Sequence, residues 1–124
     1  MPEITNIFDS HAHYNDERYD IDRKELLEQM HCHSVSAILN VGCTLEEAQK
    51  AVLLAEQYPY IYASVGIHPE ESQTVPNDYL EQLTRLAASK KVVAVGEIGL
   101  DYHYDSTDKP SQKKIFQEQH PENV

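Results

Sequence analysis

The chain has 124 residues, 40% of them hydrophobic, and carries a net charge of −11 from 10 basic and 21 acidic side chains. This length suffices for one domain with a hydrophobic core. The negative charge excludes broad electrostatic binding to nucleic acid, which needs stripes of lysine and arginine. It is compatible with a phosphodiester substrate, because a bound divalent metal supplies positive charge locally and carboxylates hold such metals.

The sequence predicts a protein of a reducing compartment. No apolar run approaches the ~20 residues that span a membrane, and the first residues lack the cationic and apolar stretches of a signal peptide. We therefore expect a cytoplasmic protein. The two cysteines, Cys32 and Cys43, are too few for a disulfide scaffold and are expected to be free thiols.

Apolar patterning predicts four βα units in chain order. Strands are expected at residues 4–8, 35–41, 60–65 and 92–95, and helices at 22–30, 44–57, 78–88 and from 108 onward. Thr44 and Glu47 form a capping box at the second helix, and Pro110 suits the first turn of the fourth. Ile115 and Phe116 are expected on the buried side of that fourth helix.

Continuous apolar strands that recur about every 30 residues indicate an α/β fold with parallel βα repeats, in which helices cover the sheet. Four such units make either a small open sheet or half of an eight-stranded barrel, whose full length is typically ~250 residues. In both architectures the ligand site lies at the carboxyl ends of the strands.

Metal-type side chains follow the first strand at this end of the predicted sheet. His11 and His13 are two apart, and such side chains on an extended segment share a face and lie about 7 Å apart. Both imidazoles can therefore reach one metal, with Asp9 as a partner for an imidazole N–H. The alternative for this His-x-His pattern is a pair of polar residues at the start of a loop.

Glu97 comes directly after the fourth, otherwise apolar strand. A carboxylate at such a position is costly to desolvate unless it is paired or metal-bound. Glu97 is therefore predicted to be a metal ligand, and one carboxylate can bridge two ions held about 3.5–4 Å apart. The alternative is a glutamate that points from the strand end into solvent. His31 and His33 lie at a predicted helix C-terminus and are interpreted as structural, because imidazoles there complement the helix dipole.

Three segments together resemble the TatD family of metal-dependent hydrolases: residues 7–15 (IFDSHAHYN), 66–69 (GIHP) and 95–102 (VGEIGLDY). The match runs from about residue 7 to about residue 119. The resemblance implies the N-terminal half of a TIM (β/α)8 barrel, and hydrolysis of phosphodiester bonds of DNA. It implies that His11 and His13 ligate one metal, that Glu97 is catalytic and bridges two, and that His68 and Asp101 contact substrate. The implied cofactors are two divalent ions, drawn from Zn, Mn, Mg or Ni.

The resemblance also implies a partial hydrolase domain at residues 1–119, holding the first four βα units, and a divergent tail at 120–124. In the family, two further histidines and an aspartate come from later strands, so we expect a truncated or frameshifted product or a piece of a longer enzyme. Two alternatives stay open: an inactive, non-catalytic half-barrel, and another His-x-His metallohydrolase of the amidohydrolase type. DNA is the expected substrate, no membrane partner is expected, and open edges of the first and fourth strands are expected to promote self-association.

Overall fold

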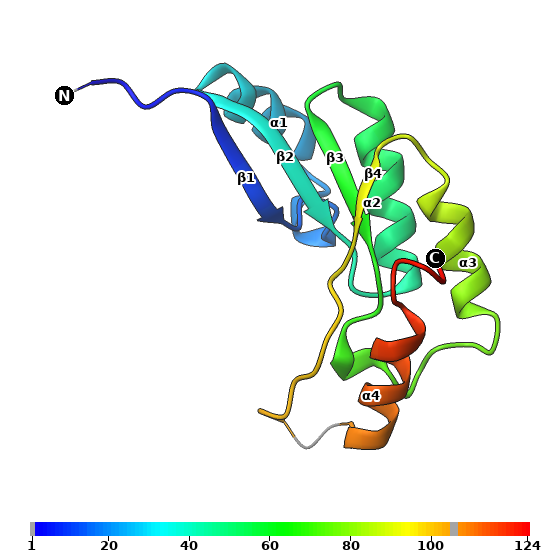
Figure 1. Cartoon of the computed structure of the whole chain (residues 1–124). Helices are drawn as coiled ribbons and strands as arrows, with labels where there is room; N and C mark the ends of the chain where they lie inside the picture. The colour runs from blue at the N-terminus through cyan, green and yellow to red at the C-terminus, as the bar shows by residue number, and fades with distance from the viewer. Residues whose placement is uncertain (1, 105–106) are drawn as a thin grey trace.

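The computed structural model describes residues 2–104 and 107–124, which form a four-stranded parallel sheet with helices (Figure 1). The strands β1 (Ile7–Ala12), β2 (Val35–Val41), β3 (Ile61–Val65) and β4 (Val92–Val95) lie side by side in sequence order. Between and after them come α1 (Arg23–Cys32), α2 (Leu45–Gln57), α3 (Tyr79–Ala87) and α4 (Lys109–Glu118), with short 3-10 turns η1 (Glu17–Tyr19) and η2 (Pro69–Glu71). The predicted α/β fold with parallel βα repeats is confirmed. No helix in the described part of the chain is both long and apolar enough to cross a membrane.

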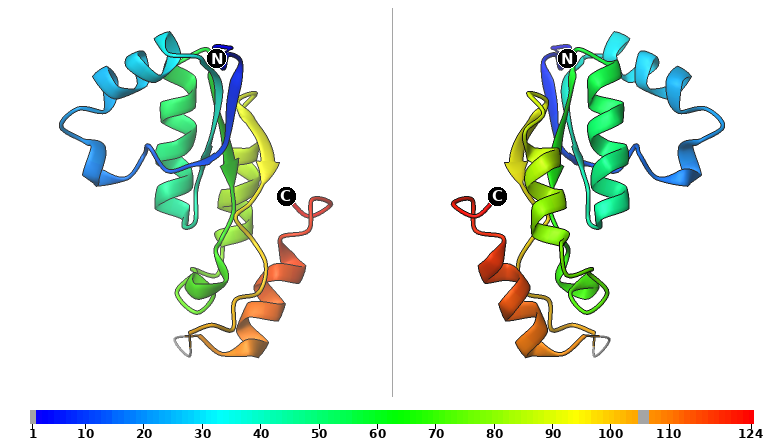
Figure 2. Two further views of the ribbon diagram at one scale, coloured as in Figure 1. Left: turned by 90° about the vertical axis from the view of Figure 1, so that its left-hand side faces the viewer. Right: turned by 90° about the vertical axis from the view of Figure 1, so that its right-hand side faces the viewer.

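Three helices pack against the sheet. α1 contacts β2, α2 contacts β2 and β3, and α3 contacts β3 and β4. Figure 2 shows α1 and α2 on the same side of the sheet when it is viewed edge-on. The inner face of α2 presents Ala48, Ala51 and Ala55, all fully buried, so small side chains let this helix lie close to the strands. The burial of this apolar helix face and of the strand residues away from water is the main source of the stability that holds the helices on the sheet.

The start of α2 is fixed by its cap and by a glycine. The Glu47 amide donates to the Thr44 hydroxyl at 3.1 Å, as the capping box predicts. The Glu47 carboxylate reaches one residue further back than expected and accepts from the Cys43 amide at 3.0 Å. Gly42 is required here because an added Cβ would lie 2.4 Å from the Ala48 Cα. The turn from β2 into α2 is therefore tightly specified.

Two details of the sequence interpretation were wrong. β1 spans Ile7–Ala12 rather than residues 4–8, because its pairing with β2 continues to Ala12 opposite Asn40. His11 therefore lies within the strand. Phe116 is 41% exposed although Ile115 is buried, because α4 packs against η2 rather than on the sheet and buries only a narrow stripe.

Two buried glutamines fasten α4 to the loops beyond β3 and β4. The Gln119 side chain accepts from the Ile67 amide at 2.6 Å and donates to the Ile67 carbonyl at 3.2 Å. The Gln112 side chain makes the same pair of bonds with the backbone of Asp101, at 2.9 and 2.8 Å. Each glutamine side-chain amide thus pairs with both the N–H and the C=O of one loop residue, as the backbone of a neighbouring strand would.

Replacing Gln119 with alanine is expected to lower the free energy of unfolding by about 1–3 kcal/mol, because the buried Ile67 amide and carbonyl lose their partners. The matched control is Gln117→Ala on the exposed side of the same helix, which should be near neutral. Urea unfolding measures the stability change, and hydrogen exchange at the Ile67 amide should become faster only in the Gln119 variant. Equal exchange in both variants would contradict the proposed role of this hydrogen-bond pair.

Candidate metal centre

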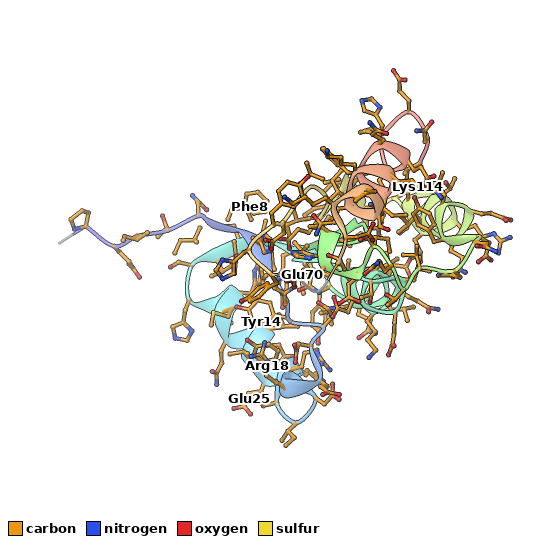
Figure 3. All side chains as sticks on the ribbon, turned by 90° about the horizontal axis from the view of Figure 1, so that it is seen from below. Phe8, Tyr14, Arg18, Glu25, Glu70 and Lys114 are labelled. Carbon is orange, nitrogen blue, oxygen red and sulfur yellow. The ribbon has the colours of Figure 1, made fainter. Side chains whose placement is uncertain are left out.

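Figure 3 views the molecule from below, toward the carboxyl ends of the strands. The two histidines and the glutamate predicted as metal ligands come from these ends of β1 and β4. His11 lies in β1, His13 follows it, and Glu97 lies two residues beyond β4. One ligand atom from each of the three side chains falls within 4.8 Å of the others. The structure therefore brings these three predicted residues together.

The cluster joins the two edge strands of the sheet. β1 and β4 are not neighbours, and the path of the chain after β4 explains the contact. The Gly96 amide bonds to the Val65 carbonyl at 2.9 Å, and the Glu97 amide then bonds to the Gly42 carbonyl at 3.3 Å, beyond the end of β2. The segment after β4 therefore passes the carboxyl end of β3 and reaches the end of β2. This path brings the Glu97 carboxylate close to β1.

Gly66 makes the crossing sterically feasible. A Cβ at this position would lie 2.8 Å from the carbonyl carbon of Gly96, which is closer than real Cβ contacts allow. Any larger residue would push the segment before Glu97 away from β3. The sequence interpretation did not single out Gly66 for this role, since the crowding arises between segments about 30 residues apart, a separation typical of successive βα units.

The orientation of His13 leaves one ring nitrogen available as a ligand. Its Nδ1 lies 3.1 Å from the Val41 carbonyl, which can only accept, so the proton of the neutral ring resides on Nδ1. The Nε2 lone pair then points to the cluster, where the His11 Nε2–H donates to it over 3.2 Å. A backbone carbonyl that fixes the imidazole tautomer is the usual support of a metal-binding histidine.

The spacing of the three ligand atoms suits a divalent ion. His11 Nε2 lies 3.2 Å from His13 Nε2 and 3.3 Å from Glu97 Oε2. Nitrogen and oxygen ligands held about 2.0–2.2 Å from one tetrahedral ion lie roughly 3.4 Å apart. The donor set of two neutral imidazoles and one carboxylate also occurs in catalytic zinc sites. Both geometry and chemistry therefore fit a metal, and the Glu97 side chain, 35% exposed, is accessible to one.

His68 lies on the other side of the Glu97 carboxylate. It caps η2, and its Nδ1 accepts from the Glu70 amide at 3.1 Å, so the neutral ring carries its proton on Nε2. That Nε2 lies 3.6 Å from Glu97 Oε1, too far for a strong hydrogen bond. His68 is therefore set as a donor beside the cluster, and its role as a substrate contact stays a prediction.

Asp101 is used by its own loop. Its carboxylate accepts from the His103 amide at 3.0 Å, while Gln112 holds its backbone. Within residues 2–104 and 107–124, the Asp101 side chain makes no hydrogen bond or ion pair with His11, His13, His68 or Glu97. The structure therefore does not bring this predicted residue into the cluster, and substrate binding by Asp101 stays a prediction.

Cys43 adjoins the cluster, a position that the sequence interpretation did not give it. Its thiol donates to Glu97 Oε2 across 3.6 Å. Burial, and secondarily the nearby charge of Glu97, raises the pKa of the Cys43 thiol to about 12. Both cysteines are free, as predicted. The sequence feature that could have predicted this position is that Cys43 comes just after a buried strand, as Glu97 does.

Comparison with known proteins identifies the family. The model of the TatD related DNase family matches residues 8–121. The chain belongs to the TatD family. A protein of Bacillus subtilis named uncharacterized metal-dependent hydrolase YabD is 40% identical over 113 residues, which are 91% of this chain and 44% of that protein. A protein of Cronobacter sakazakii named 3'-5' ssDNA/RNA exonuclease TatD is 32% identical, over 91% of this chain and 43% of its own length.

The fold agrees with this family. The crystal structure of YJJV, a TatD homologue from Escherichia coli K12, superposes with a TM-score of 0.82 at 31% identity and covers 91% of this chain and 44% of YJJV. The chain thus spans less than half the length of the TatD relatives it matches. Its four βα units correspond to the N-terminal half of a TIM barrel, as the sequence predicted.

Proposed function

We propose that His11, His13 and Glu97 are ligands of a divalent-metal centre that hydrolyses phosphodiester bonds in single-stranded DNA or RNA. The observation that carries the proposal is the convergence of three ligand atoms within 4.8 Å at the carboxyl ends of the strands. Membership of the TatD family supports it, as does the name of the Cronobacter sakazakii relative, an exonuclease of single-stranded DNA and RNA.

Each side chain has a distinct task in this proposal. A bound divalent ion supplies a Lewis acid and lowers the pKa of a coordinated water. His13, fixed by the Val41 carbonyl, presents its Nε2 lone pair, and His11 presents a second nitrogen 3.2 Å away. Glu97 brings the negative charge that offsets that of the ion. The neutral His68 ring carries its proton on Nε2, and this N–H is available to donate a hydrogen bond to a phosphate oxygen of the substrate.

The proposed ligands also explain how an acidic chain could bind a negatively charged substrate. A net charge of −11 repels a polyanionic substrate at long range. Two neutral imidazoles and a single carboxylate leave one positive charge on a divalent ion, so the site itself attracts phosphate. We accordingly expect substrate binding to depend on bound metal, in contrast to proteins that bind nucleic acid through basic stripes.

The test is a nuclease assay on the purified 124-residue chain. With Mn2+ present, the chain should release nucleotides from end-labelled single-stranded DNA and RNA, and removal of the ion by a chelator should stop the release. The variant His13→Asn should be slower by at least about 100-fold, since even residues that only support metal ligands are worth about 10–100-fold. Comparing 3'- and 5'-labelled strands reveals the direction of cleavage.

Two outcomes would contradict the proposal. Hydrolysis that persists in the chelator or in His13→Asn would not come from this site. A chain that binds metal near-stoichiometrically and hydrolyses no nucleic acid would be a non-catalytic metal-binding half-barrel, the alternative that the sequence left open.

A further inference from the structure

The two outer strands of the sheet have unpaired edges. Within the described residues, β1 pairs only with β2, and β4 pairs only with β3. Soluble proteins often protect such edges with lysine or proline, but β1 (IFDSHA) and β4 (VVAV) contain neither. The description of the 124-residue chain leaves out only residues 1, 105 and 106, which are too few for a strand along either edge. Any strand that pairs with these edges therefore comes from another molecule.

One face of the sheet carries apolar side chains that lie outside the core. In the register of β2 and β3, Ile38 lies opposite Ile61, and Leu39 lies opposite Tyr62. Ile38 and Ile61 are fully buried, in the cluster that also holds side chains of α2 and α3. Leu39 and Tyr62 are only half-buried and lie outside that cluster. Because successive side chains of a strand point to opposite faces, Leu39 and Tyr62 lie on the face away from these helices.

This face extends onto both edge strands. Phe8 of β1 lies opposite Ala37, which is two residues before Leu39 in β2. Ala94 of β4 lies opposite Ser64, which is two residues after Tyr62 in β3. Residues two apart on a strand share a face, and Phe8 is 57% exposed while Ala94 is exposed as well. An apolar surface, the open face, thus reaches from one unpaired edge to the other and consists of Phe8, Ala37, Leu39, Tyr62 and Ala94.

We propose that a second copy of this chain covers the open face, and that the two copies form a closed parallel barrel of eight strands. A two-fold axis that runs along the strands, in front of the open face, keeps all strands parallel. It sets β4 of each copy beside β1 of the other, so both edges of both copies are paired. Eight strands enclose an interior that side chains just fill, and here the two open faces supply them. The ligand clusters of both copies then lie at the same end of the barrel.

The charge of the chain opposes this association and gives it a salt dependence. Each copy carries a net charge of −11, so two copies repel one another at long range. The surfaces brought together in the barrel interior are apolar, and salt screens the repulsion between them. The dissociation constant of the dimer should therefore fall as the salt concentration rises.

Analytical ultracentrifugation of the purified chain in a chelator tests the proposal without metal or activity. The chain should sediment as a dimer and should not grow further, because a closed barrel leaves no strand edge free. Phe8→Glu should weaken the dimer by at least about 100-fold, since it places an unpaired carboxylate in the barrel interior. Ala94→Glu, at the opposite edge, should act in the same way and replaces Phe8→Glu if that variant does not fold. Leu53→Glu is the matched control, because Leu53 is 52% exposed on α2, and it should dimerise as the unaltered chain does.

Hydrogen exchange locates the interface. Amides of β1 and β4 that point away from the sheet should exchange more slowly in the dimer than in the Phe8→Glu variant, while amides shared between β2 and β3 should exchange alike in both. A chain that stays monomeric at every concentration measured would overturn the proposal. So would a dimer that persists in both glutamate variants of the open face, a dimer lost in Leu53→Glu, or species that keep growing with concentration. None of these outcomes bears on the metal centre, which the nuclease assay tests separately.

Discussion

Replacing Glu97 with glutamine is expected to abolish near-stoichiometric binding of divalent metal by the purified chain. The amide oxygen has the size of the carboxylate oxygen but lacks its charge, so the ion keeps two imidazoles and loses the anionic donor. We expect the affinity to fall by at least about 100-fold, the upper range for losing a group that only supports a ligand. Elemental analysis after dialysis and calorimetric titration measure the change.

Glu25→Gln is the control for this experiment. Glu25 is an exposed glutamate on α1 that does not belong to the His11, His13 and Glu97 cluster, and its substitution removes the same charge from the chain. It should bind metal as the unaltered protein does. Both variants should unfold at the same temperature without metal, which separates a lost ligand from a lost fold. Undiminished binding in Glu97→Gln would show that the metal is held elsewhere.

Replacing Leu83 with alanine is expected to destabilise the fold by about 3 kcal/mol, within the 2–5 kcal/mol range for a buried leucine. Leu83 lies in the middle of α3, has no exposed surface, and belongs to the same buried cluster as Ala51 and Ala55 of α2. The substitution removes apolar contact and leaves a cavity where α3 meets the sheet. Because the stability of such domains is only about 5–15 kcal/mol, this is a large fraction of the total.

Urea unfolding followed by circular dichroism measures this effect. With a urea dependence of about 1–3 kcal/mol per molar, the midpoint should fall by roughly 1–3 M. The control is Leu53→Ala on α2, where the leucine is 52% exposed and its loss should change stability by less than about 0.5 kcal/mol. Similar midpoints for the two variants would mean that α3 does not contribute to the cooperative core.

Much of the fold was predictable because its signals are local. Strands β2 and β4 lie where the apolar runs predicted them, and α2 begins at its capping residue Thr44. The extent of β1 was not predictable from its own residues, because the pairing of Ala12 with Asn40 extends it. The exposure of Phe116 depends on where α4 packs, and a helical pattern does not contain that information.

The candidate site divides in the same way. His11, His13 and Glu97 were predictable as a group, since metal-type side chains at the ends of parallel strands meet at one edge of a sheet. Cys43 and Gly66 were not assigned their places, because both depend on how the segment after β4 crosses beneath β3. The tautomers of His13 and His68 likewise depend on carbonyl and amide partners that only the folded backbone supplies.

The sheet has one property that bears on how the chain acquires its structure. Each strand pairs only with the strands next to it in sequence, and all pairs are parallel. During synthesis, each new strand can therefore pair with the edge of the strand made just before it, so the sheet can extend in the order in which the chain is translated. Contacts between successive units keep loop closure short, which favours rapid folding relative to sheets with distant pairings. The contact between His11 and Glu97 joins the first strand to the segment that follows the fourth, so the ligand cluster can assemble only when all four strands are in place.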